Sequence, residues 1–210
     1  QLVLLLTGGH TQIYLMKNSK YVKILGESVD DALGEAFDKT AKMLGLGYPG
    51  GAQIEMMAKK GDGDSYKLPK PLIDKNNLNF SFSGIKTHIN LLSKKNEINE
   101  TFTKNISASF QKTITELITS KIETAIDILY KENIFIKSIS IVGGVANNEY
   151  IKNKLKNLFD HKKIKLYYPI KEMTSDNAAM IAWACIKNYQ KSKNDIFFKP
   201  KARMKINDFL

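Results

Sequence analysis

The sequence predicts an α/β protein, and three observations support that class. Its 210 residues suffice for one domain or two small lobes, and 43% hydrophobic with 25% charged residues is typical of a globular protein. Short apolar runs that favour β-strand occur near the start of the chain, and a long stretch with helical periodicity follows in its middle. Toward the end, strands and helices alternate, which is typical of a sheet with crossover helices.

The first element predicted is a β-hairpin in LVLLLTGGHTQIYLM. Leu2 to Leu6 and Gln12 to Met16 both favour strand, and Gly8-Gly9 between them can take positive φ in a tight primed turn. Paired glycines also leave bare N–H groups that suit phosphate oxygens, so the turn has a functional interpretation as well. The hairpin alone does not decide between the two interpretations. A third strand is expected in YVKILGE.

Helices are expected after the third strand. The first begins at about Val29, with Ser28 or Asp30 as its N-cap, and ends at Gly45. The segment LGYPGG then predicts a turn, followed by a short helix around Ile54.

The longest helix is expected from Thr101 to Tyr130, where apolar residues recur at helical spacing. After it, SISIV predicts a buried strand, GGVANN a turn, and Glu149 to Phe159 a helix. IKLYYP predicts another strand, and Thr174 is expected to cap the last helix, SDNAAMIAWACI. The single cysteine, Cys185, is predicted to be a small core residue, and it excludes a disulfide framework.

The charge balance has two interpretations. Lys and Arg number 32 against 21 Asp and Glu, a formal net charge of +11, which favours an anionic partner such as nucleic acid. A general excess of Lys and Asn explains the same charge equally well. No apolar run approaches the roughly 20 residues of a membrane span, and no signal-peptide pattern occurs. We therefore expect a cytoplasmic protein with no membrane partner, or alternatively one of an organelle matrix.

Two Gly-Gly turns, in LLTGGHT and IVGGVANN, each follow a buried apolar strand. The second leads into a helix, whose N-terminus carries unpaired N–H groups and the positive end of the dipole. We expect LVLLL and SISIV to lie in one sheet, and Gly8, Gly9, Gly51 and an outward-facing Asn148 to converge on one nucleotide cleft. Neither turn is a Walker loop, because no Gly-Lys-Ser/Thr follows it.

Five segments resemble, in order and spacing, the tRNA threonylcarbamoyladenosine transferase family, formerly labelled glycoproteases. They are LLTGGHTQ, GESVDDALGEAFDKTAKMLGLGYPGG, FSFSGIKT, IVGGVANN and TSDNAAMIAW. The resemblance covers essentially the whole chain. It implies a lobe of the actin-like ATPase (ribonuclease H-like) fold with a mostly helical insertion. The implied parts are a hairpin, strand and helices in 1–58, the insertion in 59–105, a closing α/β segment in 106–190 and a basic tail in 191–210, with the N-terminal lobe absent.

The resemblance also implies an activity, that of an acyltransferase incomplete in this chain. Family members move a threonylcarbamoyl group from threonylcarbamoyl-AMP to the exocyclic amine of the adenosine beside the anticodon, in tRNAs reading ANN codons. The implied partners are tRNA, this adenylate and helper subunits of the modification complex. No catalytic residue is assigned.

Substrate-binding residues are carried over by motif position. The acyl-adenylate pocket takes Leu5, Leu6, Thr7, Gly8, Gly9 and His10. Asp38 and Gly51 would hold the sugar, with Glu55 at a position that is acidic in some members, and Asn148 would contact the nucleotide from the opposite side. These residue types suit the task, because glycine amides neutralise phosphate oxygens and carboxylates accept from ribose hydroxyls.

The resemblance implies one divalent metal, iron or zinc, with Asp176 as a carboxylate ligand that helps to orient and polarise the acyl group. The family's two metal-binding histidines, on an H-x-x-x-H helix, have no counterpart, since His10, His88 and His161 lie far apart in sequence. We therefore expect an incomplete metal site and little transfer by this chain alone. Without the resemblance, Asp38 would be a solvated helix residue and Asp176 part of a helix cap.

Two other functions stay open. One is a kinase of the actin-like fold, which would need a catalytic acid beside an acceptor pocket, and nothing in the sequence marks one. The other is a non-catalytic scaffold that binds nucleotide and partner subunits. A protease lacks support, because there is no H-E-x-x-H motif and no Cys/His or Ser/His pairing in evidence.

Overall fold

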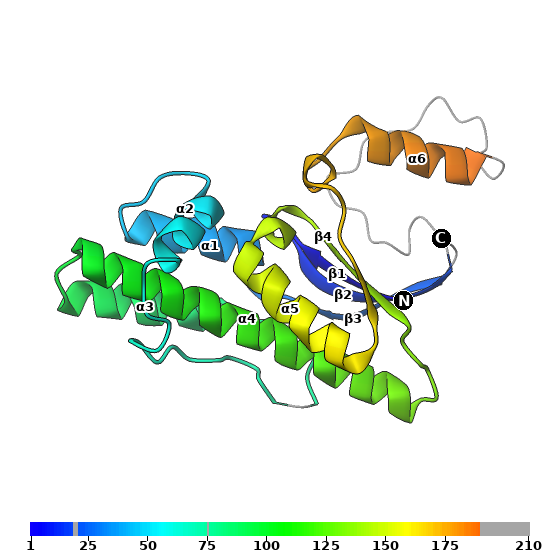
Figure 1. Ribbon diagram of the computed structural model, residues 1–210, viewed down its shortest axis with the longest axis horizontal. Helices are drawn as coiled ribbons and strands as arrows, with labels where there is room; N and C mark the ends of the chain where they lie inside the picture. Colours follow the sequence, from blue (N-terminus) through cyan, green and yellow to red (C-terminus); the bar gives the residue numbers. More distant parts are fainter. Residues whose placement is uncertain (19–20, 75, 190–210) are drawn as a thin grey trace.

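The computed structural model describes residues 1–18, 21–74 and 76–189. Its strands form one five-stranded sheet in the order β3-β2-β1-β4-β5, and long helices pack beneath it (Figure 1). The expected α/β class is confirmed. The strands are β1 (Leu2–Leu6), β2 (Thr11–Asn18), β3 (Tyr21–Glu27), β4 (Ser138–Val142) and β5 (Lys165–Tyr167).

The sheet is mixed, with β1 at its centre. β1 pairs antiparallel with β2, where Leu6 faces Thr11, and parallel with β4, where Leu4 faces Ile141. LVLLL and SISIV therefore share one sheet, as the sequence predicts. Alternate residues of β1 are buried, because one face of the strand packs onto the helices and the other is only half-covered.

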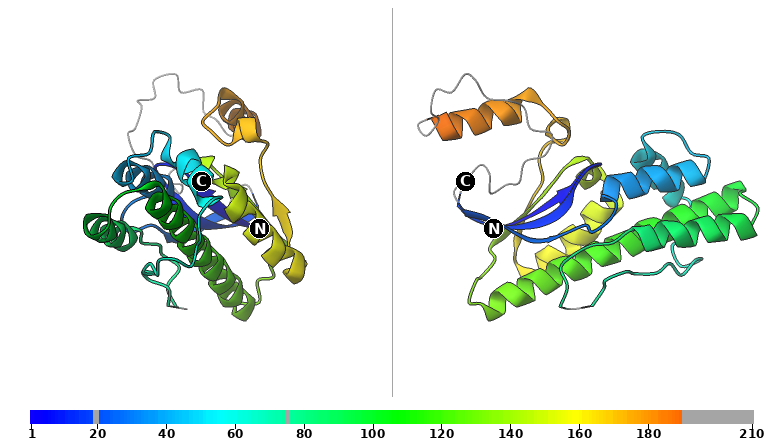
Figure 2. Two further views of the ribbon diagram at one scale, coloured as in Figure 1. Left: turned by 60° about the vertical axis from the view of Figure 1, so that its left-hand side comes forward. Right: turned by 180° about the vertical axis from the view of Figure 1, so that it is seen from behind.

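Along the chain, helices occupy the stretch between β3 and β4, and after β4 they alternate with strands (Figures 1 and 2). The long α4 crosses under the sheet, and its Phe110 packs edge-to-face on Phe37 of α1 with ring centroids 5.0 Å apart. The α-helices are α1 (Leu33–Met43), α2 (Gly50–Ala58), α3 (Ser83–Lys95), α4 (Glu100–Lys131), α5 (Glu149–Lys162) and α6 (Ala178–Asn188). Two short 3₁₀ helices are η1 (Gly144–Asn147) and η2 (Lys171–Met173).

The expected insertion over 59–105 contains α3. Before α3, the described residues of 59–82 form turns and extended chain, apart from a single parallel bridge between Ser28 and Phe80. The limits of the four predicted segments stay a prediction. The basic tail over 191–210 lies outside the described residues.

The start of α1 differs from the prediction. The helix begins at Leu33, not near Val29, and neither Ser28 nor Asp30 caps it. The Leu33 N–H instead donates to the buried hydroxyl of Thr11 at 2.7 Å. That donor is satisfied from the neighbouring strand, which no local cap pattern reveals. The predicted end is confirmed, since Gly45 follows the last turn with φ +70°.

The last helix also corrects two predictions. Asn177, not Thr174, caps α6, because its side chain accepts from the Met180 N–H at 3.0 Å. Thr174 donates to the carbonyl oxygen of Lys171 instead. Cys185 is exposed and not a core residue, because α6 stands apart from the layers around the sheet (Figure 2).

None of the helices in the described ranges combines the length and the apolar character needed to cross a membrane.

Candidate functional site

Three backbone segments meet where β1 ends. A Cβ on Gly143, whose φ is +100°, would lie 2.3 Å from the carbonyl oxygen of Leu6. A Cβ on Gly34, in the first turn of α1, would lie 2.8 Å from the Cα of Gly8. Only glycine permits such approaches, so the hairpin turn, the start of α1 and the turn after β4 touch backbone to backbone. Both predicted Gly-Gly turns therefore lie at the same edge of the sheet.

The hairpin turn is organised by Thr7 and not by left-handed glycines. The Thr7 hydroxyl accepts from the backbone N–H of Gly9 at 3.2 Å and of His10 at 2.9 Å. Gly8 and Gly9 do not adopt positive φ, so the prediction of a primed turn is wrong, and the side-chain hydrogen bonds of a Ser/Thr turn replace it. A Cβ on either glycine would meet open space. The bare side of the turn is therefore accessible, as a phosphate-binding turn requires.

Asp38 joins the two halves of the GEAFDKTAK…GYPGG motif. Its Oδ1 accepts from the Gly50 N–H at 2.8 Å, so a residue of α1 caps the first turn of α2. A Cβ on Gly50 would lie 2.6 Å from the Asp38 Cα, which means that this spacing also serves close helix packing. Asp38 is half-buried and partnered, and not a solvated helix residue. A Cβ on Gly51 would meet open space.

Glu55 and Asn148 both act at the start of α5. Glu55 Oε1 accepts from the Glu149 N–H at 2.9 Å, and Asn148 Oδ1 accepts from the Ile151 N–H at 3.0 Å. The Asn148 amide nitrogen donates to Gln111 Oε1 of α4 at 2.8 Å, and the residue is only 6% exposed. The expectation that Asn148 faces outward is therefore wrong, because its cap bond and its amide partner both draw it into the protein.

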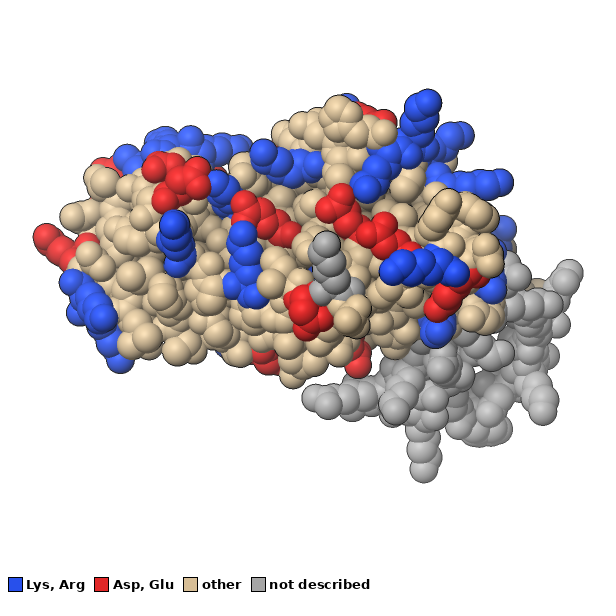
Figure 3. Space-filling view, turned by 90° about the horizontal axis from the view of Figure 1, so that it is seen from below, with Lys and Arg blue, Asp and Glu red and all other residues tan. Residues whose placement is uncertain are grey.

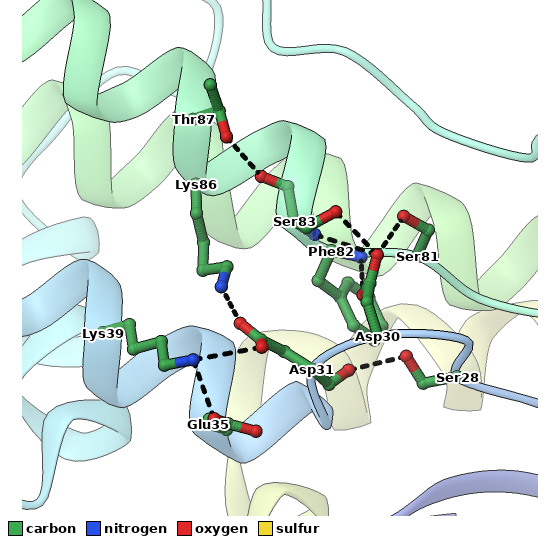
Figure 4. Close-up of polar contacts among 10 residues, drawn as sticks. All are labelled: Ser28, Asp30, Asp31, Glu35, Lys39, Ser81, Phe82, Ser83, Lys86 and Thr87. Carbon is green, nitrogen blue, oxygen red and sulfur yellow. Dashed lines mark hydrogen bonds and ion pairs between the residues drawn. The ribbon is translucent and has the colours of Figure 1, made fainter.

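A polar cluster that the sequence analysis missed joins α1 to α3 (Figure 4). The Asp30 carboxylate accepts from the Phe82 N–H at 2.8 Å and from the hydroxyls of Ser81 and Ser83 at 2.5 and 2.7 Å. Partial burial raises the pKa of Asp30, but these hydrogen bonds outweigh it and hold the pKa below its usual value. The signal in the sequence is a pair of serines flanking the start of a helix that has no cap of its own.

Asp31, the next residue, makes the ionic part of the cluster. Its carboxylate pairs with Lys39 of α1 at 3.0 Å and with Lys86 of α3, and Lys39 also pairs with Glu35 at 2.7 Å. Asp30 thus holds the N-terminal turn of α3, and Asp31 holds Lys86, which is the first lysine of that helix. The segments GESVDD and FSFSGIKT are therefore in direct polar contact in the fold.

The predicted substrate residues border different hollows. Gly9 and His10 line a small one of about 60 Å³ together with Asp30. Glu55 lines another of about 420 Å³ with Gln111 and residues of α5. Convergence of Gly8, Gly9, Gly51 and Asn148 on a single cleft, and the substrate roles of Leu5, Leu6, Thr7 and His10, stay predictions.

A family model described as tRNA N6-adenosine threonylcarbamoyltransferase (TsaD) matches residues 1–183. The chain belongs to this family. Proteins of that name from Wolbachia pipientis wMel and Rickettsia rickettsii (strain Sheila Smith) are 41% and 45% identical to it over 99% of this chain. The matched parts are 62% and 61% of those proteins, so the chain spans about three fifths of the length of the curated relatives it matches.

The chain also resembles a solved structure at a TM-score of 0.46 and 17% identity. That structure is the activator of the 2-hydroxyisocaproyl-CoA dehydratase from Clostridium difficile with bound ADPNP. The match covers 94% of this chain and 65% of that one.

The predicted metal ligand of this family member stands alone. Asp176 is exposed in the connection between η2 and α6, and it precedes the cap residue Asn177. It therefore lies before the first turn of α6 and does not cap the helix. Among the described residues, no group of three or more His, Cys, Asp or Glu could hold a metal ion. The described residues of this chain therefore do not by themselves make up a complete metal site.

Proposed function

We propose that this chain takes part in transferring the threonylcarbamoyl group from threonylcarbamoyl-AMP to the exocyclic amine of the adenosine beside the anticodon of tRNA. The observation that carries the proposal is the family match over residues 1–183. Neither a kinase nor a scaffold has an observation of its own in favour. The activity is that of a complete protein, of which this chain corresponds to about three fifths.

The transfer is an acyl substitution. The adenosine amine attacks the carbamoyl carbon, a new C–N bond forms, the bond from that carbon to the phosphate oxygen breaks, and AMP leaves while the amine loses a proton. The phosphate gains charge as it leaves, so hydrogen-bond donors aimed at it lower the barrier. The accessible turn at Gly8-Gly9 lies next to the start of α1, where the positive end of the helix dipole favours an anion. The Gly9 and His10 N–H groups would turn from the Thr7 hydroxyl to the phosphate as it binds.

Carboxylates are suited to hold the sugar. Asp38 and Glu55 each use one oxygen, Oδ1 and Oε1, on a backbone N–H of the fold. The second oxygen of each is left to accept from a ribose hydroxyl. Asn148 differs, because both ends of its amide are engaged inside the protein. Its proposed part is to hold the turn after β4 in place.

The adenylate site is tested by measuring the binding of a non-hydrolysable threonylcarbamoyl-AMP analogue with calorimetric titration. Gly34→Ala places a methyl group against the turn at Gly8 and should weaken binding at least tenfold. Gly47→Ala is the matched control, because its new methyl group meets open space. Undiminished binding by a folded Gly34→Ala protein would contradict the assigned site. Transfer is then measured as modified adenosine in tRNA by mass spectrometry. A phosphorylated product from ATP and a candidate sugar would instead support the kinase.

A further inference from the structure

A basic groove runs beside α5 and β5, away from the Gly-Gly turns. It has a volume of about 630 Å³ and is lined by four lysines, two carboxylates and the amide of Asn153. Figure 3 shows Lys side chains along the rim of the face seen from below, whereas the centre of that face mixes both signs. The charged residues of the groove are Lys152, Lys156, Lys163, Lys165, Glu149 and Asp160.

The lysines form a row. Lys152 and Lys156 are four residues apart and lie on one face of α5, Lys163 follows the end of that helix, and Lys165 opens β5 just beyond. Lys152 is partly engaged, since its Nζ lies 3.7 Å from Glu149 and 5.2 Å from the centre of the Tyr168 ring. Lys156, Lys163 and Lys165 are exposed and pair with no carboxylate within the described ranges. Three cations in a row are therefore free to meet a linear polyanion.

Lys163 has a backbone conformation that disfavours any residue with a side chain. It follows the last turn of α5 with φ 55° and ψ 31°, the left-handed conformation for which glycine is preferred. A cation also stabilises the carbonyl end of a helix dipole, which would be a purely structural reason for a lysine here. Lys162 occupies the same helix end but points elsewhere, where it pairs with Glu123 of α4 at 3.3 Å. The two neighbours thus separate a role in the groove from a role at the helix end.

We propose that this groove binds the phosphodiester backbone of the RNA substrate. The inference rests on the proposed function, which supplies RNA as the partner. The groove itself supplies an open shape, a row of unpaired cations, and an amide that can donate to phosphate oxygens. Such contacts position a nucleic acid without reading its bases, and each releases counterions on binding.

The test compares tRNA binding by this chain and three variants over a range of salt concentrations. Fluorescence anisotropy measures the affinity. A triple variant, Lys156→Ala with Lys163→Gly and Lys165→Ala, should bind tRNA at least tenfold more weakly at low salt. Its plot of log affinity against log salt should be shallower by about 2, because each phosphate contact contributes roughly 0.7 to 0.9 to the slope. Lys162→Ala removes one positive charge outside the groove, as Lys163→Gly alone does inside it, and should leave affinity and slope unchanged.

Lys163→Gly alone distinguishes the two roles of that residue. We expect a higher melting temperature, because the left-handed strain is relieved, together with tRNA binding weakened about threefold. A lower melting temperature with unchanged binding would assign Lys163 to the helix end and contradict the proposal.

Other outcomes overturn the groove and leave the proposed function testable. A triple variant that keeps its circular dichroism spectrum and binds tRNA like the wild type would mean that RNA binds elsewhere. Polyglutamate that displaces tRNA at equal charge concentration would mean that the groove suits an acidic protein. Absence of tRNA binding by the wild-type chain would remove the groove, whereas analogue binding at the Gly8 turn would still support the proposed function.

Discussion

Helices α4 and α6 reverse the usual relation between composition and burial. The helix α6 is almost wholly apolar, yet it leaves Met180, Ile181, Trp183 and Ile186 between 45% and 66% exposed. The helix α4 is far more polar, yet much of its polar surface is buried. Its buried polar residues are Thr103, Ser107, Ser109, Gln111, Thr113, Thr115, Lys121 and Thr124.

The difference shows that hydrogen-bond partners allow several polar side chains of α4 to be buried, although the buried Ser107 hydroxyl has none among the described residues. Gln111 of α4 accepts from Asn148, the Ser109 hydroxyl accepts from the Tyr66 N–H at 3.2 Å, and Lys121 donates to two loop carbonyls. These hydrogen bonds offset the cost of removing the groups from water. The apolar surface of α6 has no comparable cover among the described residues, and exposed apolar surface of this extent is typical of interaction sites.

The largest expected effect comes from the centre of α4. Phe110→Ala should lower the free energy of unfolding by about 3–5 kcal/mol, because a fully buried ring that packs on Phe37 is lost and a cavity remains. Urea denaturation followed by circular dichroism measures the change. Phe110→Leu should cost clearly less, since it fills most of the space. A loss below 1 kcal/mol for Phe110→Ala would mean that α4 is not the structural centre.

The buried amide pair should show the next largest effect. Gln111→Ala leaves the Asn148 amide nitrogen without its partner and should destabilise the protein by about 1–3 kcal/mol. A double-mutant cycle with Asn148→Ala should give a coupling energy above roughly 0.5 kcal/mol, as neighbours in contact do. Strictly additive losses would show that the two side chains do not depend on each other.

The start of α3 lies between the two extremes, because it is exposed but held by Asp30. Asp30→Asn should cost about 0.5–2 kcal/mol at neutral pH, as loss of a helix cap does. The lowered pKa of Asp30 gives a stabilisation that is present above the unfolded-state pKa of about 3.9 and is lost as the pH falls through the lower folded-state value. Unfolding curves at pH 7 and pH 3 should therefore differ less for Asp30→Asn than for the wild type. An equal pH dependence would contradict the cap.

The smallest effects are expected in α6. Ile181→Ala should change the free energy of unfolding by less than about 0.5 kcal/mol, since its side chain is 65% exposed. Trp183 is the single tryptophan and is 60% exposed, so acrylamide should quench its fluorescence nearly as well in the folded as in the unfolded protein. Strong protection of Trp183 in the folded chain would break the contrast between the two helices.

Local patterns were enough to predict most of the elements. The apolar run at residues 2–6 and the helical spacing across residues 101–130 are properties of neighbouring residues, and the elements found there match within a residue or two. The α6 cap was placed three residues early, at Thr174 in place of Asn177, and two other caps were missed because the partner is distant. Thr11 caps α1 from the adjacent strand, and Asp30 caps α3 from 52 residues earlier along the chain. A sequence pattern holds no information on which distant oxygen meets a given N–H.

The candidate site was predictable in its backbone and not in its side chains. The two Gly-Gly turns end adjacent parallel strands, so their meeting follows from the topology alone. Asn148 was misjudged because its orientation depends on Gln111, a residue on another helix. Cys185 was misjudged for the opposite reason, since its apolar neighbours predict a core that the described fold does not build around it.

The pairing of β1 with β4 also bears on how the chain is made. Leu2 pairs with Leu15 soon after synthesis, but its other neighbour, Ile139, is more than 130 residues away. At a synthesis rate of about 5–20 residues per second, the second edge of β1 waits for roughly 7 to 27 seconds on the ribosome. During that interval a hydrophobic strand edge is open to pairing with other nascent chains. The central strand of the finished sheet is therefore the one most open to pairing with other chains during synthesis.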